Sequence, residues 1–204
     1  MEFAAPWPAI FVFDLGRYLF TAMVFTVVLL LIPPAVLAMR RVRDRLPWTN
    51  QRWHEVRHSV VAAIVFSLIG LGVYHGAQHG FFHVYSEAAR YGWLYWGASL
   101  VLVIVAHDAY FYWAHRWMHR PSVFRRVHRT HHLSVAPTQW AAYSFSIGEA
   151  AMQAAFLPLF LLLVPTHTTV LFIWMAHQVV RNVAGHCGAI WRSEERRVGK
   201  ECRS

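Results

Sequence analysis

Carboxylates and cysteines are scarce in this chain, and each scarcity narrows the range of possible functions. Only 10 of the 204 residues are acidic, and the 2 cysteines, Cys187 and Cys202, form no CxxC motif or disulfide framework. The chain also lacks the paired ExxH motifs with which soluble di-iron bundles bind metal. Because 57% of the residues are hydrophobic and only 14% are charged, an ordinary soluble domain of this size is excluded.

The positive charge of the chain is almost entirely arginine, since Lys200 is the single lysine among 19 basic residues. In a membrane protein such charge marks cytoplasmic loops and segments that contact lipid headgroups. Basic patches with base-stacking aromatics in a soluble context are missing, so no nucleic-acid partner is expected. The N-terminus lacks a positive region and a cleavage site, which predicts a retained anchor and not a signal peptide.

Long apolar runs predict the architecture. We expect spans over residues 18–39, 58–74 and 93–113, the first of them kinked or ended by Pro33 and Pro34. A fourth apolar stretch, 149–180, is broken by Pro158 and Pro165, and we expect a hairpin that enters the membrane and returns. The sequence therefore predicts an all-α integral membrane helical bundle of about four spans with a cytosolic histidine-rich helical cap.

Two arginine-rich segments, 40–57 and 116–129, predict the orientation, because the positive-inside rule places both in the cytoplasm. The dominance of arginine suggests a GC-rich bacterial gene, hence the inner membrane. His75, His79 and His83 are spaced four apart on the opposite side, where we favour an interfacial segment over a functional site.

The segment from His107 to His132 contains 6 of the 14 histidines. His115 and His119 form an HxxxH pair, and an HxxHH cluster follows at His128, His131 and His132. At helical spacing each set points its imidazoles to one side, as a metal site requires. The alternative is a pair of polar interfacial helices with solvated histidines. Five well-spaced histidines, with His177 and His186 in reserve, exceed the needs of one tetrahedral ion, so two metal ions sharing imidazoles are predicted.

Four further residues are candidates for orienting those ligands, each with a structural alternative. Asp108 either supports an imidazole or is an interfacial charge, and His107 points away from His115 and is expected to be a buried polar residue. Glu149 is either a partner of a ligand or the start of a helix. Asn182 is expected to anchor the loop that carries His186.

These motifs, in order, carry a resemblance. HDAYFYWAHRWMH, HRTHH, APTQWAAYSF and RNVAGHCG resemble the fatty acid hydroxylase superfamily, which includes sterol desaturase-like enzymes. The resemblance covers residues 93 to 190. It implies a membrane-bound oxidoreductase that binds two non-haem irons and uses O2 to hydroxylate or desaturate a C–H bond of a fatty acyl or sterol-like lipid. Electrons would come from a reductase or small redox carrier. His115, His119, His128, His131 and His132 fall on the two histidine boxes, His186 matches a later histidine and His177 is a weaker match.

The chain departs from the family pattern in two places. No further HxxHH box follows His186, and Ser146 and Ile147 stand where members have a histidine–proline pair. After Trp191 the composition changes abruptly to RSEERRVGKECRS. We therefore expect membrane anchor spans over 1–92, an incomplete catalytic region over 93–191, and a non-native tail over 192–204 of a chain truncated at its C-terminus.

Three other functions compete with this interpretation. A haem-binding electron carrier would need facing histidines at mid-span, whereas these histidines gather at the end of one span. A histidine-rich metal transporter or sensor would need acidic residues along a path through the spans, which contain almost none. An inactive relative is the third. The sequence specifies neither the substrate, the electron donor nor the oligomeric state.

Overall fold

The computed structural model describes residues 6–33, 35–37 and 48–187. The predicted cytoplasmic arginines 40–45 and the predicted tail 192–204 lie outside these residues. In chain order the elements are α1 Pro6–Leu31, α3 Gln51–Gln78, β1 Val84–Tyr85, the 3-10 helix η1 Ala88–Arg90, α4 Gly92–Met118, α5 Pro121–Val127, α6 Arg129–His132, the 3-10 helix η2 Gln139–Tyr143, α7 Ile147–Leu163, β2 Thr166–His167 and α8 Thr168–His186.

The predicted all-α membrane bundle is confirmed. Three helices, α1, α3 and α4, are long and apolar enough to cross a membrane. Helix α4 is exposed along Leu94, Val101 and Val105, as expected of a surface that faces lipid. The two-residue strands β1 and β2 pair in parallel, so that the connection between α3 and α4 meets the turn between α7 and α8.

The first span was misplaced by the sequence pattern. Helix α1 begins at Pro6, well before the predicted residue 18. Pro6 and Pro8 fall in the first turn, where the missing N–H of proline breaks no helical hydrogen bond. Pro33 follows the end of the helix, as predicted.

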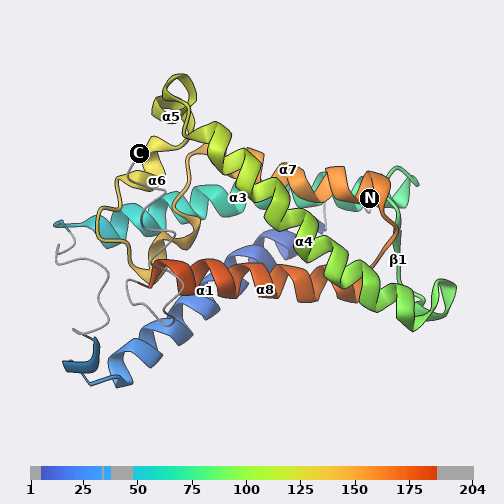
Figure 1. The fold of residues 1–204 in the computed structure, drawn as a ribbon, viewed down its shortest axis with the longest axis horizontal. Helices are drawn as coiled ribbons and strands as arrows, with labels where there is room; N and C mark the ends of the chain where they lie inside the picture. The colour runs from blue at the N-terminus through green and yellow to red at the C-terminus, as the bar shows by residue number, and fades with distance from the viewer. Residues whose placement is uncertain (1–5, 34, 38–47, 188–204) are drawn as a thin grey trace.

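The predicted hairpin over 149–180 is confirmed. Helices α7 and α8 are antiparallel, and the turn between them lies beside β1 (Figure 1). Pro165 lies in that turn. Pro158, predicted to break the segment, instead lies inside a continuous α7. The return of α8 brings its C-terminal end, with His186, to the end of the bundle where α4 finishes.

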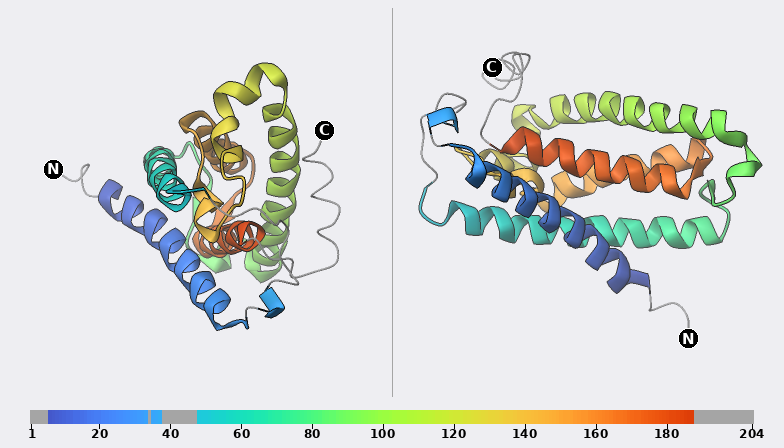
Figure 2. Two further views of the ribbon diagram at one scale, coloured as in Figure 1. Left: turned by 90° about the vertical axis from the view of Figure 1, so that its left-hand side faces the viewer. Right: turned by 90° about the horizontal axis from the view of Figure 1, so that it is seen from below.

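A cap made of α5, α6 and η2 covers this same end (Figure 1). The HxxHH motif was expected on one helical face, but the helix is interrupted: α5 ends at Val127, His128 lies between the helices, and α6 has four residues. Figure 2 shows α1 running obliquely across the bundle, and it packs against α3 and α8. The buried side chains Tyr18, Tyr143 and Phe145 join α1 to the cap.

Candidate metal centre

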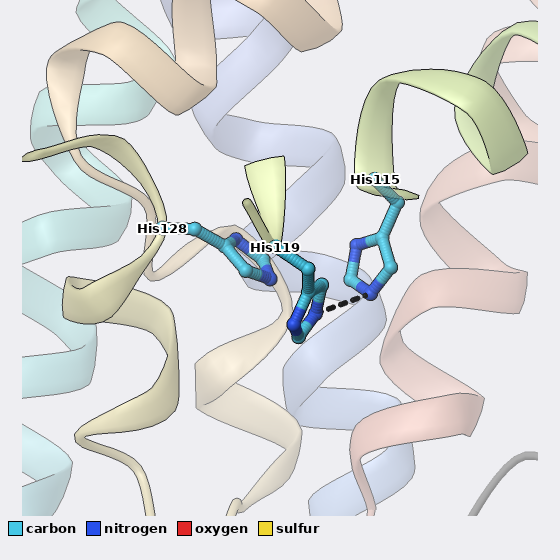
Figure 3. A group of neighbouring side chains, drawn as sticks. All are labelled: His115, His119 and His128. Atoms are coloured by element: carbon cyan, nitrogen blue, oxygen red, sulfur yellow. Dashed lines mark hydrogen bonds between the residues drawn. The ribbon is translucent and has the colours of Figure 1, made fainter. Parts of the chain in front are cut away.

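Three of the predicted ligands meet at the end of α4. His115, His119 and His128 each offer a ligand atom, and these atoms all lie within 4.8 Å of one another. The Nε2 atoms of His115 and His119 are 3.1 Å apart (Figure 3). His115 lies in the last turn of α4 and His119 immediately after it, so the helical spacing itself places both imidazoles on one side.

A second pair forms across the bundle between α6 and α8. The Nε2 atoms of His131 and His186 are 3.3 Å apart, although the two residues are 55 positions apart in the chain. The Nδ1–H of His186 donates to the carbonyl oxygen of Asn182 at 2.7 Å, which leaves Nε2 directed at His131. Asn182 in turn donates from Nδ2 to the carbonyl oxygen of Ala142 in η2.

His132 lies against the first group. Its ring centroid is 4.7 Å from that of His128 and 5.1 Å from that of His119. His128 and His131 are stacked at 5.4 Å, so the two groups adjoin. Six of the seven predicted ligands therefore converge.

Glu149 contacts this cluster through His128. Its Oε1 lies 2.9 Å from Nδ1 of His128, and both side chains are 1% exposed. This contact occupies Nδ1 of His128 and leaves Nε2 as the ring atom available to a metal ion. Burial, assisted by the imidazoles of His115, His132 and His119, lowers the pKa of His128 to about 2. The ring is neutral at physiological pH, as a ligand must be.

Ser146 fixes the His128–Glu149 contact from both sides. Its hydroxyl donates to the carbonyl oxygen of Val127 at 2.5 Å and accepts the backbone N–H of Glu149 at 3.2 Å. It is thus the N-cap of α7 and a link to the end of α5. The residue that departs from the family's histidine–proline pair has a defined structural role in this chain.

The donor set fits a metal. Two imidazole nitrogens bound to one ion at roughly 2.1 Å lie about 3.0 to 3.4 Å apart, which is the spacing of both Nε2 pairs. Among the described residues, Nε2 of His128 and Nδ1 of His131 are buried without a hydrogen-bond partner. Burial also holds the pKa of His131 well below its ordinary value, assisted by His186, His128, His132 and His115. Neutral, buried and incompletely satisfied imidazoles are what a metal centre requires.

Three other predicted site residues lie apart from the cluster. His177 is on α8, about 13 Å along the helix axis from His186, and its Nδ1 is buried without a partner among the described residues. His107 packs against Phe156 and Trp174, with centroids 4.9 and 5.3 Å away. Asp108 pairs with Arg181 at 2.5 Å, so it joins α4 to α8 and orients none of the six imidazoles here.

Sequence reasoning missed Glu55. This carboxylate in α3 is fully buried and accepts hydrogen bonds from Gln51 at 2.8 Å and from Thr138 at 2.5 Å. Gln51 also donates to the carbonyl oxygen of Ala136. The network anchors the segment that leads into η2. Phe145 follows η2, and its ring centroid lies 5.4 Å from that of His131. An acidic residue at the start of an apolar span was the available signal.

A cavity of about 2030 Å³ opens beside the histidines. His115, His131, His132 and His186 line it, together with mostly apolar side chains from α1, α3, α4, α7 and α8 and with polar ones such as Asp14, Arg17 and Gln178. Examples of the apolar side chains are Phe13, Phe66, Leu157 and Leu171. The cluster therefore faces a space large enough for a lipid.

The profile of the family described as fatty acid hydroxylase matches residues 100–202, half of the chain. The chain belongs to the fatty acid hydroxylase family. The matched residues include the whole histidine cluster, so the family assignment and the geometry concern the same site.

Several fatty acid hydroxylase relatives are sterol-oxidising enzymes. The chain is 33% identical over 116 residues to a Delta(7)-sterol 5(6)-desaturase of Gibberella zeae, covering 57% of this chain and 36% of that protein. It is 29% identical over 118 residues to a Delta(7)-sterol 5(6)-desaturase of Schizosaccharomyces pombe, covering 58% and 39%. Against human lathosterol oxidase it is 24% identical over 123 residues, covering 59% and 41%. No solved structure matches the chain significantly.

The matched region thus spans about two fifths or less of the length of these relatives. The fatty acid hydroxylase assignment and the apolar helices together make the chain an integral membrane protein with a histidine cluster able to hold metal.

Proposed function

We propose that this protein is a membrane-bound non-haem di-iron oxidoreductase that uses O2 to hydroxylate or desaturate a lipid C–H bond. One observation carries the proposal: six histidines from four segments converge, and four of them line a largely apolar cavity. A cluster of neutral imidazoles suits iron in both the ferrous and the ferric state. The names of the sterol-oxidising relatives support the same reaction class.

The two groups of histidines suggest how two irons would be shared. His115, His119 and His128 would hold one ion, while His131 and His186 would hold the other, with His132 next to the first. When bound, such irons supply the activation of O2 that breaking an unactivated C–H bond requires. His177 remains a candidate ligand only if α8 moves, because it lies far from His186 in this structure.

The protein's own residues orient the ligands and exclude water. Glu149 holds the Nδ1 proton of His128, and the Asn182 carbonyl holds that of His186, so both rings present Nε2. Phe145, which is buried, packs on His131 and shields it from solvent. The apolar wall keeps a lipid's hydrocarbon in place of water beside the cluster.

An electron donor is part of the proposal. The end of α4 and the segment from Arg120 to α6 expose five arginines: Arg116, Arg120, Arg125, Arg126 and Arg129. A positive surface of this kind favours association with an acidic reductase domain or small redox carrier. Under the positive-inside rule the same arginines support a cap that faces the cytoplasm, and we propose a bacterial inner membrane location.

Iron content tests the proposal directly. The protein is purified in detergent, incubated anaerobically with ferrous iron, and assayed for iron per chain and for visible absorption. We expect two irons per chain without a porphyrin band. His119→Ala or His131→Ala should lose most of the iron, whereas His79→Ala, an exposed histidine on the other side of the bundle, should keep it. Full iron retention in both cluster variants would refute the ligand assignment.

Turnover tests the reaction class. Iron-loaded protein is supplied with O2, a chemical or enzymatic reductant, and either sterol or phospholipid vesicles, and the lipids are analysed by mass spectrometry. Products one oxygen heavier or two hydrogens lighter support the oxidoreductase. Iron uptake across the membrane of sealed vesicles, without lipid products, would instead support the metal transporter.

A further inference from the structure

Helix α1 carries two charged residues in the middle of its span, Asp14 and Arg17. Their side chains are only 8% and 18% exposed, although α1 has lipid-facing side chains such as Val12 and Phe20. Ionisable residues inside a span are costly and mark functional positions by default. Both line the cavity that leads to the histidines.

The pair has hydrogen-bonding capacity left over. Nε and Nη2 of Arg17 lie 3.1 and 2.8 Å from Oδ1 of Asp14, and Nη1 donates to the carbonyl oxygen of Met175 in α8 at 3.1 Å. A guanidinium has five N–H groups, so two of them have no partner among the described residues. Oδ2 of Asp14 has no described partner either. One free acceptor and two free donors therefore lie on adjacent residues that line the cavity.

A phenol lies on the same cavity wall as this ion pair. Tyr143, also on the cavity wall, stacks on Tyr18 with ring centroids 4.9 Å apart. Burial raises the pKa of Tyr143, and the charges of Arg17 and Asp14 act on the same hydroxyl, the first lowering and the second raising it. The phenol therefore stays protonated and able to donate. We name Asp14, Arg17 and Tyr143 the polar triad.

The polar triad and four of the clustered histidines line the same cavity. Along α8, Met175, which Arg17 contacts, precedes His186 by about 16 Å of helix. In the cap, the Phe145 ring contacts both Tyr143 and His131, with ring centroids 6.4 and 5.4 Å away. Gln178 also lines the cavity, and its Nε2 is buried without a partner among the described residues.

The chemistry of the triad selects its ligand. Asp14 and Arg17 neutralise each other, so the site offers no net charge to a carboxylate or phosphate, and the free Asp14 oxygen repels either. A hydroxyl group both accepts and donates, and it matches an adjacent donor and acceptor. We infer that the polar triad binds the hydroxyl group of a neutral lipid alcohol and holds its hydrocarbon toward the histidine cluster.

This inference rests on the proposed function for the role of the bound lipid, but not for its binding. A purely structural role would make Arg17 a clamp between α1 and α8 through Met175. The two roles differ in one respect, because a clamp does not distinguish alcohols from fatty acids.

The test is saturable binding of tritiated cholesterol, 1-hexadecanol and palmitic acid to metal-free protein in detergent. The double variant Asp14→Asn with Arg17→Met removes both charges together, so neither is left buried and unpaired. We expect the wild type to bind at least one alcohol more tightly than palmitic acid, and the double variant to bind it about tenfold more weakly. The matched control is Arg90→Met, an exposed arginine away from the cavity, which should bind like the wild type.

Each outcome decides the inference. Unchanged alcohol binding in the double variant overturns it, as does wild-type protein that binds neither alcohol or binds palmitic acid equally well. If the double variant fails to fold, Tyr143→Phe decides, because it keeps the ring packing and removes one donor. About fivefold weaker alcohol binding supports the triad, and unchanged binding overturns it. Iron content is measured in parallel: we expect it to be unchanged in these variants, so failure of the di-iron proposal would appear separately.

Discussion

At the scale of single residues, Glu149 is the side chain whose removal best separates ligand orientation from ligand identity. It touches the cluster through Nδ1 of His128 and is itself no ligand in the proposed arrangement. Glu149→Gln keeps the shape but replaces a carboxylate with a neutral amide. We expect iron affinity to fall by roughly 10 to 100-fold, the usual cost of losing a carboxylate that orients a ligand histidine. Competition with a ferrous chelator measures it.

The matched variant is Glu87→Gln, an exposed carboxylate outside the cluster, which should leave iron affinity unchanged. Equal affinities in the two variants would mean that His128 needs no carboxylate to present Nε2. A loss as complete as that in His119→Ala would instead make Glu149 a ligand.

Residue patterns predicted most of the ligand histidines but not the residues that orient them. The four-residue spacing of His115 and His119 directly predicted their convergence, because one helix carries both. Glu149 was predicted only as one of two alternatives, since it lies 21 positions from His128 and no periodicity joins them. The family resemblance ranked His186 above His177, and of these two His186 is the one that reaches His131, but no spacing in the sequence predicted that contact.

At the scale of elements, the cap depends on a buried network that crosses 83 residues of chain, from Glu55 in α3 to Thr138 before η2. Glu55→Ala leaves Gln51 and Thr138 with unsatisfied buried groups at about 1–3 kcal/mol each. We expect a free energy of unfolding lower by about 3 kcal/mol and visibly lower iron content. Thermal unfolding followed by tryptophan fluorescence measures the first, and metal analysis the second.

The ion pair between α4 and α8 provides the contrast. The side chains of Asp108 and Arg181 are 43% and 52% exposed, so the attraction between them is largely screened. We expect Arg181→Ala to change the free energy of unfolding by less than about 1 kcal/mol. A loss as large as that of Glu55→Ala would show that this pair, and not the buried network, holds α8 in place.

Element boundaries show what hydropathy and proline positions can and cannot predict. The hairpin of α7 and α8 was predicted correctly because Pro165 follows a long apolar run. The same reasoning failed at Pro158, which a continuous α7 accommodates, and at Pro6 and Pro8, which begin α1. A proline in the first turn removes no helical hydrogen bond, and a proline inside a helix can remove one without ending the helix, so proline position alone does not define a boundary.

At the scale of the whole molecule, the cavity links the histidine cluster to the membrane-spanning helices. Its wall draws on α1, α3, α7 and α8, segments distant in sequence, so no local pattern predicted it. The apolar surface of α4 faces outward, while His115 in its last turn lines this space. The arrangement lets a lipid approach the cluster without leaving an apolar environment.

Blocking that space without touching the histidines tests the arrangement. Ala154 lies on the cavity wall in α7, and Ala154→Trp would fill the path with an indole. We expect iron content to equal that of the wild type while lipid oxidation and cholesterol or hexadecanol binding fall at least about tenfold, since overpacking excludes the ligand. The control is Ala98→Trp, which adds the same side chain to an exposed position of α4 away from the cavity. If Ala154→Trp oxidises lipid at the wild-type rate, the substrate reaches the histidines by another route and the cavity is not its binding site. Loss of iron along with activity would mean that α7 packing, through Glu149, controls the metal centre itself.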